Sequence, residues 1–199
     1  MTQACGHREG GRGGCHKTQG QLKTLADIVA GYISCNRKCL KDDLERYEKS
    51  GTWAKAVELA ARAEGHDGKM YSHQRRVGRE NMALTAKPLL ALGRRKFGDF
   101  DALHEAVREA IQGITRVDVL AVYDTALRLG AFRGVLPECV YLHAGTKTGA
   151  KNLGFDNPPD KLAMSDLPSE FRKLKAYEVE NCLCIYKEHF KAVSALQKV

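Results

Sequence analysis

One segment, residues 115–132 (TRVDVLAVYDTALRLGAF), is apolar on nearly every side when it is drawn as a helix. A helix that is hydrophobic all round is a buried helix. Two charged residues, Asp124 and Arg128, nevertheless lie in its middle, and charges are rarely buried unless they are paired. Their spacing of four residues lets them pair along one helix face. The sequence therefore predicts a buried helix that carries either an internal ion pair or a site that needs the two charges.

The composition is that of a globular protein with a basic surface. The chain has 199 residues, 43% of them hydrophobic, and a formal net charge of +8 at pH 7. This length is enough to bury the core of one domain. Excess positive charge favours an anionic partner such as nucleic acid, a phosphate compound or an acidic protein. The alternative is that the charge only keeps the protein soluble.

The N-terminal residues and the cysteines bear on location. No apolar run approaches the roughly 20 residues of a membrane helix, so we expect no membrane partner. Residues 1–20 are polar and rich in glycine, lack the apolar segment of a secretory signal, and are expected to form a flexible tail. Seven cysteines, an odd count without an export signal, predict a cytoplasmic protein with free thiols.

Apolar residues recur at helical spacing along most of the chain, and no convincing strand pattern is present. Thr52 and Asp99 are placed to cap helices, Pro88 is expected to break or kink one, and a break is allowed near residues 34–36. The expected helical segments are residues 22–47, 52–61, 79–95, 99–111, 115–132, 146–153 and 176–196. The sequence therefore predicts an all-α protein, with a single helical domain over residues 21–199.

A short turn that contains Gly113 separates two of these helices. The four residues that follow, TRVD from Thr115, fit a capping box, which would leave backbone N–H groups and the positive helix end facing outward beside Arg116. Such a turn can hold a phosphate without reading base sequence. The segment at about residues 99–133 resembles the helix-hairpin-helix element of DNA-repair and nucleic-acid-binding proteins. Thr115 stands where that element usually has a second glycine, and a plain helix corner is the alternative.

A wider resemblance covers about residues 105–190. The segments YDTALRLG, VYLHAGT and ENCLCIYK resemble parts of a family of uncharacterised bacterial proteins, which implies one continuous unit and brings no established activity. DNA glycosylases of the helix-hairpin-helix class also place an Asp-Thr dipeptide after the hairpin. Here Asp124-Thr125 lies too close to Gly113 and is not followed by His, and no hairpin lysine fits their catalytic pattern. The sequence therefore does not favour glycosylase chemistry.

The segment 69–96 is strongly basic, with eight Lys or Arg residues and one acid, Glu80. Basic side chains of this kind follow a phosphate backbone. The candidate contacts are Arg75, Arg76 and Arg79, with Lys69, His73 and Gln74 beside them, and a second group of Arg94, Arg95 and Lys96. Few aromatic residues lie nearby, which argues against strong single-strand specificity. The alternative is a solvated face without a partner.

The stretch HAGTKTGAK from His143 partly resembles a phosphate-binding loop. It fails the pattern G-x-x-x-x-G-K-[ST], because its glycines are too close and Ala150 precedes Lys151. Thr146 and Lys147 at the expected start of a helix remain candidate phosphate contacts. An ordinary helix start with solvated lysines is the alternative.

The cysteines also permit a metal site. Cys35 and Cys39 share a helical face, and with Cys139 and His143 they would make a Cys₃His zinc site. No C-x-x-C spacing is present, and buried cysteine commonly packs as a small hydrophobe. The sequence therefore favours core packing for these cysteines and calls for no cofactor.

Three functions follow, in order of preference. The first is sequence-independent nucleic-acid binding, with DNA the expected partner, through the corner at Gly113 and the basic segment. The second is a small enzyme or ligand-binding protein, whose candidate catalytic residues are Asp124, Arg128 and His143. The third is a protein-interaction module that presents its basic face to an acidic partner.

Overall fold

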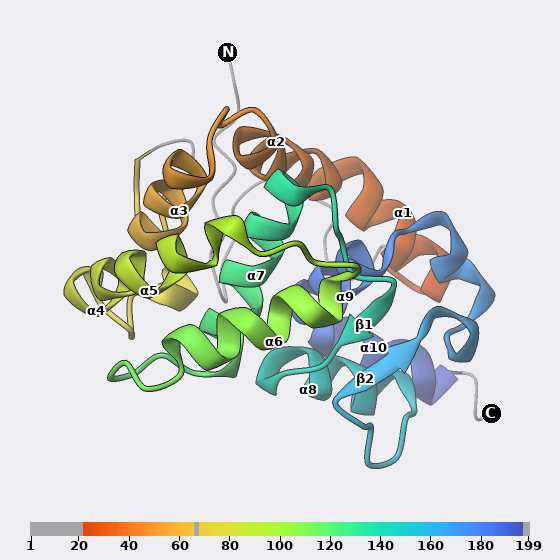
Figure 1. The fold of residues 1–199 in the computed structure, drawn as a ribbon. Coiled ribbons are helices and arrows are strands. Elements are labelled where there is room, and N and C mark those ends of the chain that lie inside the picture. Colours follow the sequence, from red (N-terminus) through yellow and green to blue (C-terminus); the bar gives the residue numbers. More distant parts are fainter. Residues whose placement is uncertain (1–21, 66–67, 197–199) are drawn as a thin grey trace. The chain divides into compact units, whose positions relative to one another are not determined.

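The computed structural model describes residues 22–65 and 68–196, and these residues are predominantly helical (Figure 1). Contacts group them into two compact units. We call residues 41–137 the central unit, and residues 22–40 together with 138–196 the terminal unit. The all-α fold class is confirmed, with one small two-stranded sheet among the described residues. The glycine-rich tail expected from the sequence lies outside the described residues.

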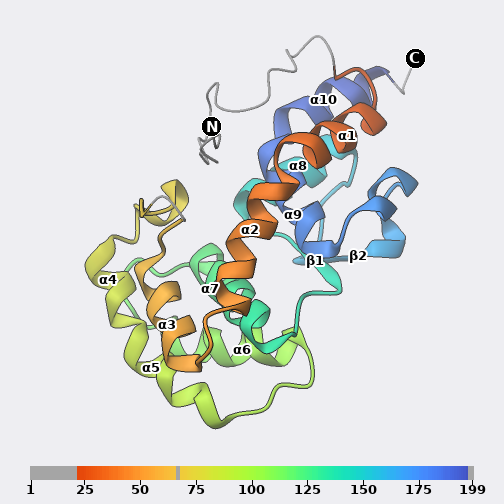
Figure 2. The ribbon, with the colours of Figure 1, turned by 90° about the horizontal axis from the view of Figure 1, so that it is seen from above.

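The terminal unit combines the start of the described chain with its end. Its elements are α1 (Leu25–Cys35), the first residues of α2 (Arg37–Glu48), β1 (Cys139–Tyr141), α8 (Ala144–Leu153), β2 (Lys161–Ala163), the 3-10 helices η4 (Met164–Asp166) and η5 (Ser169–Lys173), α9 (Ala176–Ile185) and α10 (Lys187–Leu196). Helix α8 packs against both α9 and α10, and Figure 2 shows the three together. Side chains of these elements bury one hydrophobic cluster.

Two helix breaks in the terminal unit meet through one hydrogen bond. The chain leaves α1 at Asn36, so of the two possibilities left open, one long helix or two joined near residues 34–36, the structure has two helices. The helix predicted over residues 176–196 is two helices, because α9 ends before Tyr186 and α10 starts after it. The Tyr186 hydroxyl donates to Asn36 Oδ1 at 3.0 Å, so a hydrogen bond links the residues at which the two helices are interrupted.

The two strands were not predicted. β1 lies in the stretch 137–142, which was expected to be an extended link, and it pairs antiparallel with β2, Val140 opposite Leu162. Both of these side chains are buried. A strand of three residues is too short to show the alternation by which a strand is recognised in sequence.

The glycines of the HAGTKTGAK stretch serve helix packing. Gly145 and Gly149 are four residues apart and lie on one face of α8. A Cβ atom at Gly149 would lie 2.3 Å from the Leu183 carbonyl oxygen, and one at Gly145 would lie 3.0 Å from Cys184 Sγ. The glycines therefore allow α8 to approach α9 closely, which accounts for a motif that partly resembles a phosphate loop.

The central unit contains the remaining helices. They are the rest of α2, α3 (Trp53–Arg62), the 3-10 helices η2 (Ser72–Gln74) and η3 (Leu92–Arg94), α4 (Arg79–Leu84), α5 (Ala86–Ala91), α6 (Phe100–Ile111) and α7 (Val119–Arg133). Helix α7 packs against α3 and α6, and α3 also contacts α4 and α5. Almost all of α7 from Ala121 to Ala131 is buried, which confirms the buried helix predicted from the sequence.

Caps and breaks in the central unit follow local hydrogen bonds. Thr52 accepts from the Lys55 N–H and Asp99 from the Ala102 N–H, which confirms both predicted caps. The helix predicted over residues 79–95 is interrupted at Thr85, between α4 and α5, as expected for Pro88, which has no N–H to donate to the Leu84 carbonyl. The buried Thr85 hydroxyl donates to the Met82 carbonyl at 2.6 Å. Pro88 lies in the first turn of α5, where a missing N–H costs nothing.

The predicted capping box at Thr115 is wrong. Asp118 caps α7, and its carboxylate accepts from the Ala121 N–H at 3.0 Å. The α6–α7 link therefore runs over residues 112–118 and is longer than the expected turn. Arg116 in this link has a φ of +64°, in the left-handed region that L-residues seldom adopt.

None of the helices in the described part of the chain is long and apolar enough to cross a membrane.

Candidate nucleic-acid interface

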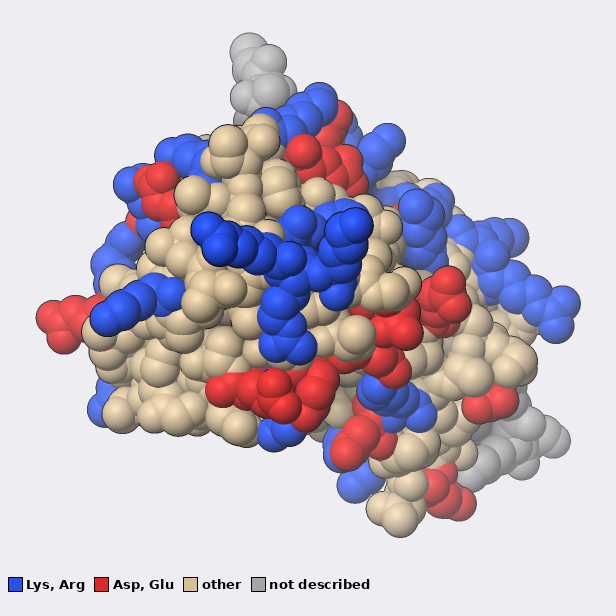
Figure 3. All heavy atoms as spheres, viewed as in Figure 1, with Lys and Arg blue, Asp and Glu red and all other residues tan. Residues whose placement is uncertain are grey.

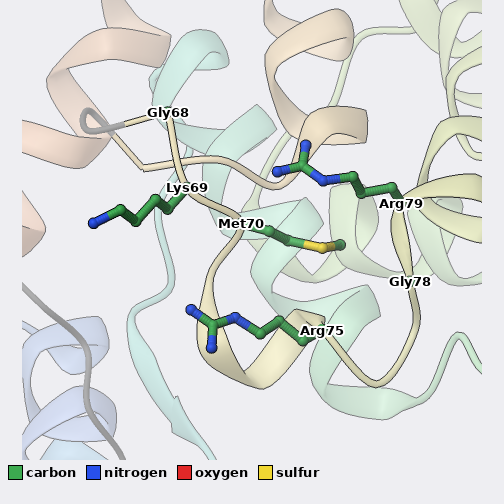
Figure 4. Close-up of a pocket in the computed structure, with 6 residues that line it drawn as sticks. All are labelled: Gly68, Lys69, Met70, Arg75, Gly78 and Arg79. Carbon is green, nitrogen blue, oxygen red and sulfur yellow. The ribbon is translucent and has the colours of Figure 1, made fainter.

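An open pocket in the central unit is bordered by basic side chains. It has a volume of about 400 Å³ and is lined by Gly68, Lys69, Met70, Arg75, Gly78 and Arg79. Figure 4 shows the guanidinium groups of Arg75 and Arg79 on opposite sides of the Met70 side chain. Among the described residues, this lining has three cationic groups and no acid. The pocket therefore suits an anion.

The cations of this pocket differ in what they contact. Arg79 pairs with Glu64, but the Arg79 side chain remains 62% exposed. Exposed ion pairs of this kind are weak, so a phosphate can compete with the carboxylate. Arg75 is exposed and forms no ion pair within the described parts of the chain. Arg75 is therefore the guanidinium that is most available to a ligand.

Arg76 points to a different partner. Its Nη2 atom lies 2.5 Å from Oδ2 of Asp118, the N-cap of α7. This ion pair joins the basic segment to the α6–α7 link, which carries the other predicted phosphate contacts, Gly113, Thr115 and Arg116. Arg116 is exposed and has no ion-pair partner among the residues described here. The two stretches that the sequence suggested for nucleic-acid binding are thus connected within one unit.

A second basic group lies at the end of η3 and on the link from η3 to α6. Arg94, Arg95 and Lys96 are all exposed, and the Arg95 guanidinium lies 5.6 Å from the centre of the Phe97 ring. Figure 3, which has the same view as Figure 1, shows a group of basic side chains over this link and acidic side chains beside it over α6. Elsewhere on that face, basic and acidic side chains lie near one another in groups that are separated by uncharged surface. The positive charge on this face is therefore gathered in local groups.

A buried network of polar side chains connects the pocket segment to α7. His73 Nε2 and Gln74 Nε2 each lie 2.6 Å from Oδ2 of Asp124. Arg128 Nη2 lies farther away, at 4.0 Å from the same oxygen. Burial alone would raise the pKa of Asp124, but His73, Arg128 and Gln74 outweigh it and hold that pKa well below its usual range. The main partners of Asp124 are therefore His73 and Gln74, which the sequence pattern did not indicate.

Arg128 contacts the same segment through a different residue. Its guanidinium lies 4.3 Å from the centre of the Tyr71 ring, and the Tyr71 hydroxyl donates to Asp43 Oδ2. Burial would lower the pKa of Arg128. The hydroxyls of Tyr47 and Tyr71 and the carboxylates of Asp124 and Asp43 outweigh this effect and raise that pKa. The Arg128 side chain is only 6% exposed. Arg128 is therefore held as a buried cation inside the central unit.

The third predicted catalytic residue, His143, belongs to the terminal unit. Its Nε2 atom lies 2.8 Å from Glu180 Oε1, and both side chains are buried. Asp124 and Arg128 belong to the central unit, so neither unit brings the three candidates together within itself.

Thr146 and Lys147 already have partners within the protein. The buried Thr146 hydroxyl accepts from the His143 N–H at 2.7 Å and donates to the His143 carbonyl at 2.9 Å. Lys147 Nζ lies 2.6 Å from Asp160 Oδ1. These contacts fix the start of α8, and the phosphate role suggested for the two residues stays a prediction.

The metal candidates are bonded in other ways. Cys35 and Cys39 are disulfide-bonded, so the expectation of free thiols is wrong for both. Cys139 lies in β1, and His143 pairs with Glu180. Over the described residues, no three His, Cys, Asp or Glu side chains are placed to hold a metal ion together.

Comparisons with protein-family models, with curated proteins and with solved structures found no match for this chain. The family and helix-hairpin-helix resemblances therefore stay predictions.

Proposed function

We propose that the central unit binds the phosphate backbone of nucleic acid, with duplex DNA the expected form, without reading base sequence. The observation that carries this proposal is the pocket lined by Lys69, Arg75 and Arg79. Guanidinium groups match phosphate oxygens in charge and geometry. Arg75 reaches this pocket without an ion-pair partner among the described residues, so a phosphate can bind it without displacing a carboxylate.

The distribution of the other cations supports a polymer over a single phosphate compound. Arg94, Lys96 and Arg116 are exposed on the same unit and form no ion pair with a described residue. Several separated cations can each contact one phosphate of a backbone. None of the described residues that line the pocket is aromatic, so they offer no platform for base stacking. These features support backbone contacts in preference to base recognition.

The test is binding of the full chain to a fluorescently labelled duplex of mixed sequence, measured by anisotropy in 50 mM salt. We expect Arg75→Gln to raise the Kd by about 3- to 10-fold, because one phosphate contact is lost. Arg108→Gln is the matched control, since it removes the same charge from a side chain that pairs with Glu105 on α6.

Two results would contradict the proposal. One is absence of binding at low salt, and the other is an equal loss of affinity in both variants, which would mean that only net charge matters. Competition with poly-glutamate provides a further check. If poly-glutamate displaced the duplex efficiently at equal charge, the acidic-protein alternative would replace nucleic acid.

A further inference from the structure

We propose that Asp124 is a positioning residue that holds the pocket segment, residues 69–79, in its binding conformation through His73 and Gln74. This inference rests on the proposed function, because it assigns the buried network a role in presenting Arg75. Asp124 does not line the pocket itself.

The segment is fixed by its backbone mainly at its start. The Tyr71 N–H donates to the Ala63 carbonyl at 2.9 Å, and Met70 forms a bridge with Glu64. Beyond Tyr71, the backbone bonds of η2 and the turn after it are local, such as those from Gln74 to Tyr71 and from Val77 to Gln74. Local bonds shape the turn but do not attach it to α7. That attachment comes from side chains.

Part of this attachment is apolar, because Met70, Tyr71 and Val77 share a hydrophobic cluster with Ala121 of α7. The side chains of η2 provide the polar part. Gln74 is 1% exposed and donates to Asp124, while the next residue, Arg75, is exposed and lines the pocket. Successive residues of a 3-10 helix are rotated by about 120°, so fixing Gln74 sets the direction in which Arg75 leaves the turn. Anchoring Gln74 therefore orients the guanidinium that is most available to a phosphate.

Both charges in the middle of α7 contact this one segment. Asp124 contacts His73 and Gln74, and Arg128 stacks on Tyr71. If the two charges served only to neutralise each other, their own separation would be short, yet it is 4.0 Å and longer than the contacts to His73 and Gln74. The pair is thus arranged to hold residues 71–74 against α7.

Net charge makes the role of Asp124 separable from electrostatic attraction. Asp124→Asn changes the formal net charge from +8 to +9, because +8 plus one lost negative charge is +9. A more positive protein attracts a polyanion more strongly. A weaker affinity in this variant therefore has the sign opposite to the charge effect and reports the loss of positioning.

The experiment compares the full chain with Asp124→Asn, with Gln74→Met and with Glu105→Gln. Gln74→Met removes one donor to Asp124 and leaves the net charge unchanged. Glu105→Gln makes the same charge change as Asp124→Asn on the exposed face of α6. Hydrogen exchange of the amides of residues 71–78 and the Kd for the duplex are measured well below the midpoint of thermal unfolding.

We expect exchange at residues 71–78 to become at least about 10-fold faster in the Asp124 and Gln74 variants, and the Kd to rise about 3- to 10-fold in both. Glu105→Gln should leave exchange unchanged and bind the duplex no more weakly than the wild type. Unchanged exchange in Asp124→Asn, or equal or tighter binding by this variant, would overturn the proposal.

If Asp124→Asn does not fold, Gln74→Met decides, and unchanged exchange with an unchanged Kd in that variant would overturn the inference. If the wild type does not bind the duplex, the proposed function fails, and the exchange measurements alone then judge whether Asp124 holds the segment.

Discussion

Asp124 is the residue at which burial and charge oppose each other most directly. The carboxylate side chain is only 15% exposed, and burial disfavours its charged form. His73, Gln74 and Arg128 reverse that effect and lower the pKa. A group whose pKa is lower in the folded than in the unfolded protein stabilises the fold above its ordinary pKa and loses this contribution in acid.

The stability difference between the wild type and Asp124→Asn should therefore depend on pH. Above the ordinary aspartate pKa of 3.8, the difference in the free energy of unfolding should be largest, roughly 2 kcal/mol. It should shrink as the pH falls below that value, since Asp124 of the unfolded wild-type chain then takes up a proton while the folded carboxylate stays charged. Urea unfolding of both proteins between pH 6 and pH 2 measures the difference. A gap that stays constant over this range would mean that Asp124 is not stabilised as an anion.

Arg116 offers a second prediction for a single residue. Its φ of +64° is strained for an L-residue but not for glycine. Arg116→Gly should therefore be more stable than Arg116→Ala by about 1 kcal/mol, although both variants lose the same charge. Chemical denaturation of the two variants tests this, and equal stability would show that the link relaxes away from the left-handed conformation.

Among the elements, α8 and α9 show how a sequence motif can serve packing. Gly149 lies where any Cβ atom would overlap the backbone of α9, so a substitution requires one helix to move. Gly113 in the α6–α7 link has no atom within 4 Å of the position a Cβ would take. The missing side chain therefore allows close helix packing at Gly149, whereas at Gly113 a Cβ atom would meet no neighbour.

Alanine at these two positions should give different results. Gly149→Ala should destabilise the protein by roughly 1–3 kcal/mol, because the overlap is with backbone that cannot rotate away. Gly113→Ala should change stability by less than about 0.5 kcal/mol. Thermal or urea unfolding of both variants checks this. A similar cost at both positions would argue against close packing of α8 on α9.

The elements also show what sequence patterns can and cannot predict. Caps at Thr52 and Asp99 and the buried helix α7 were predictable, because they depend on residues close together in the chain. The choice of Asp118 over Thr115 as the cap of α7 was not, since both residue types can cap. That choice follows from tertiary packing, because Val117 just before the cap lies against the cluster around Met70 and Tyr71.

The candidate site divides in the same way. Arg75 and Arg79 were predictable as exposed basic residues from the charge of their segment. The contacts of His73 and Gln74 with Asp124 were not, because they join residues about fifty positions apart. Nothing in a helical pattern indicates which distant side chain will approach a buried charge. The i, i+4 spacing of Asp124 and Arg128 suggested a closer pair than the 4.0 Å that is found.

At the scale of the whole molecule, residues 41–137 hold 17 Lys or Arg and 14 Asp or Glu, so the central unit carries +3 of the net charge of +8, and its exposed cations occur in local groups. Under the proposed function, a polyanion would make separate contacts with the pocket around Arg75, with Arg94 and Lys96, and with Arg116. Binding by separate phosphate contacts releases counterions, so the affinity depends steeply on salt. The slope of this dependence reports the number of phosphate contacts, which a single Kd does not.

The salt dependence of duplex binding tests the central claim most directly. The full chain, Arg75→Gln and Arg108→Gln are titrated between 50 and 200 mM salt, and the logarithm of the binding constant is plotted against the logarithm of the salt concentration. We predict that Arg75→Gln makes the slope shallower by about 0.9, one phosphate contact, and that Arg108→Gln leaves it unchanged. The same slope for all three proteins, or no binding at 50 mM salt, would contradict the account.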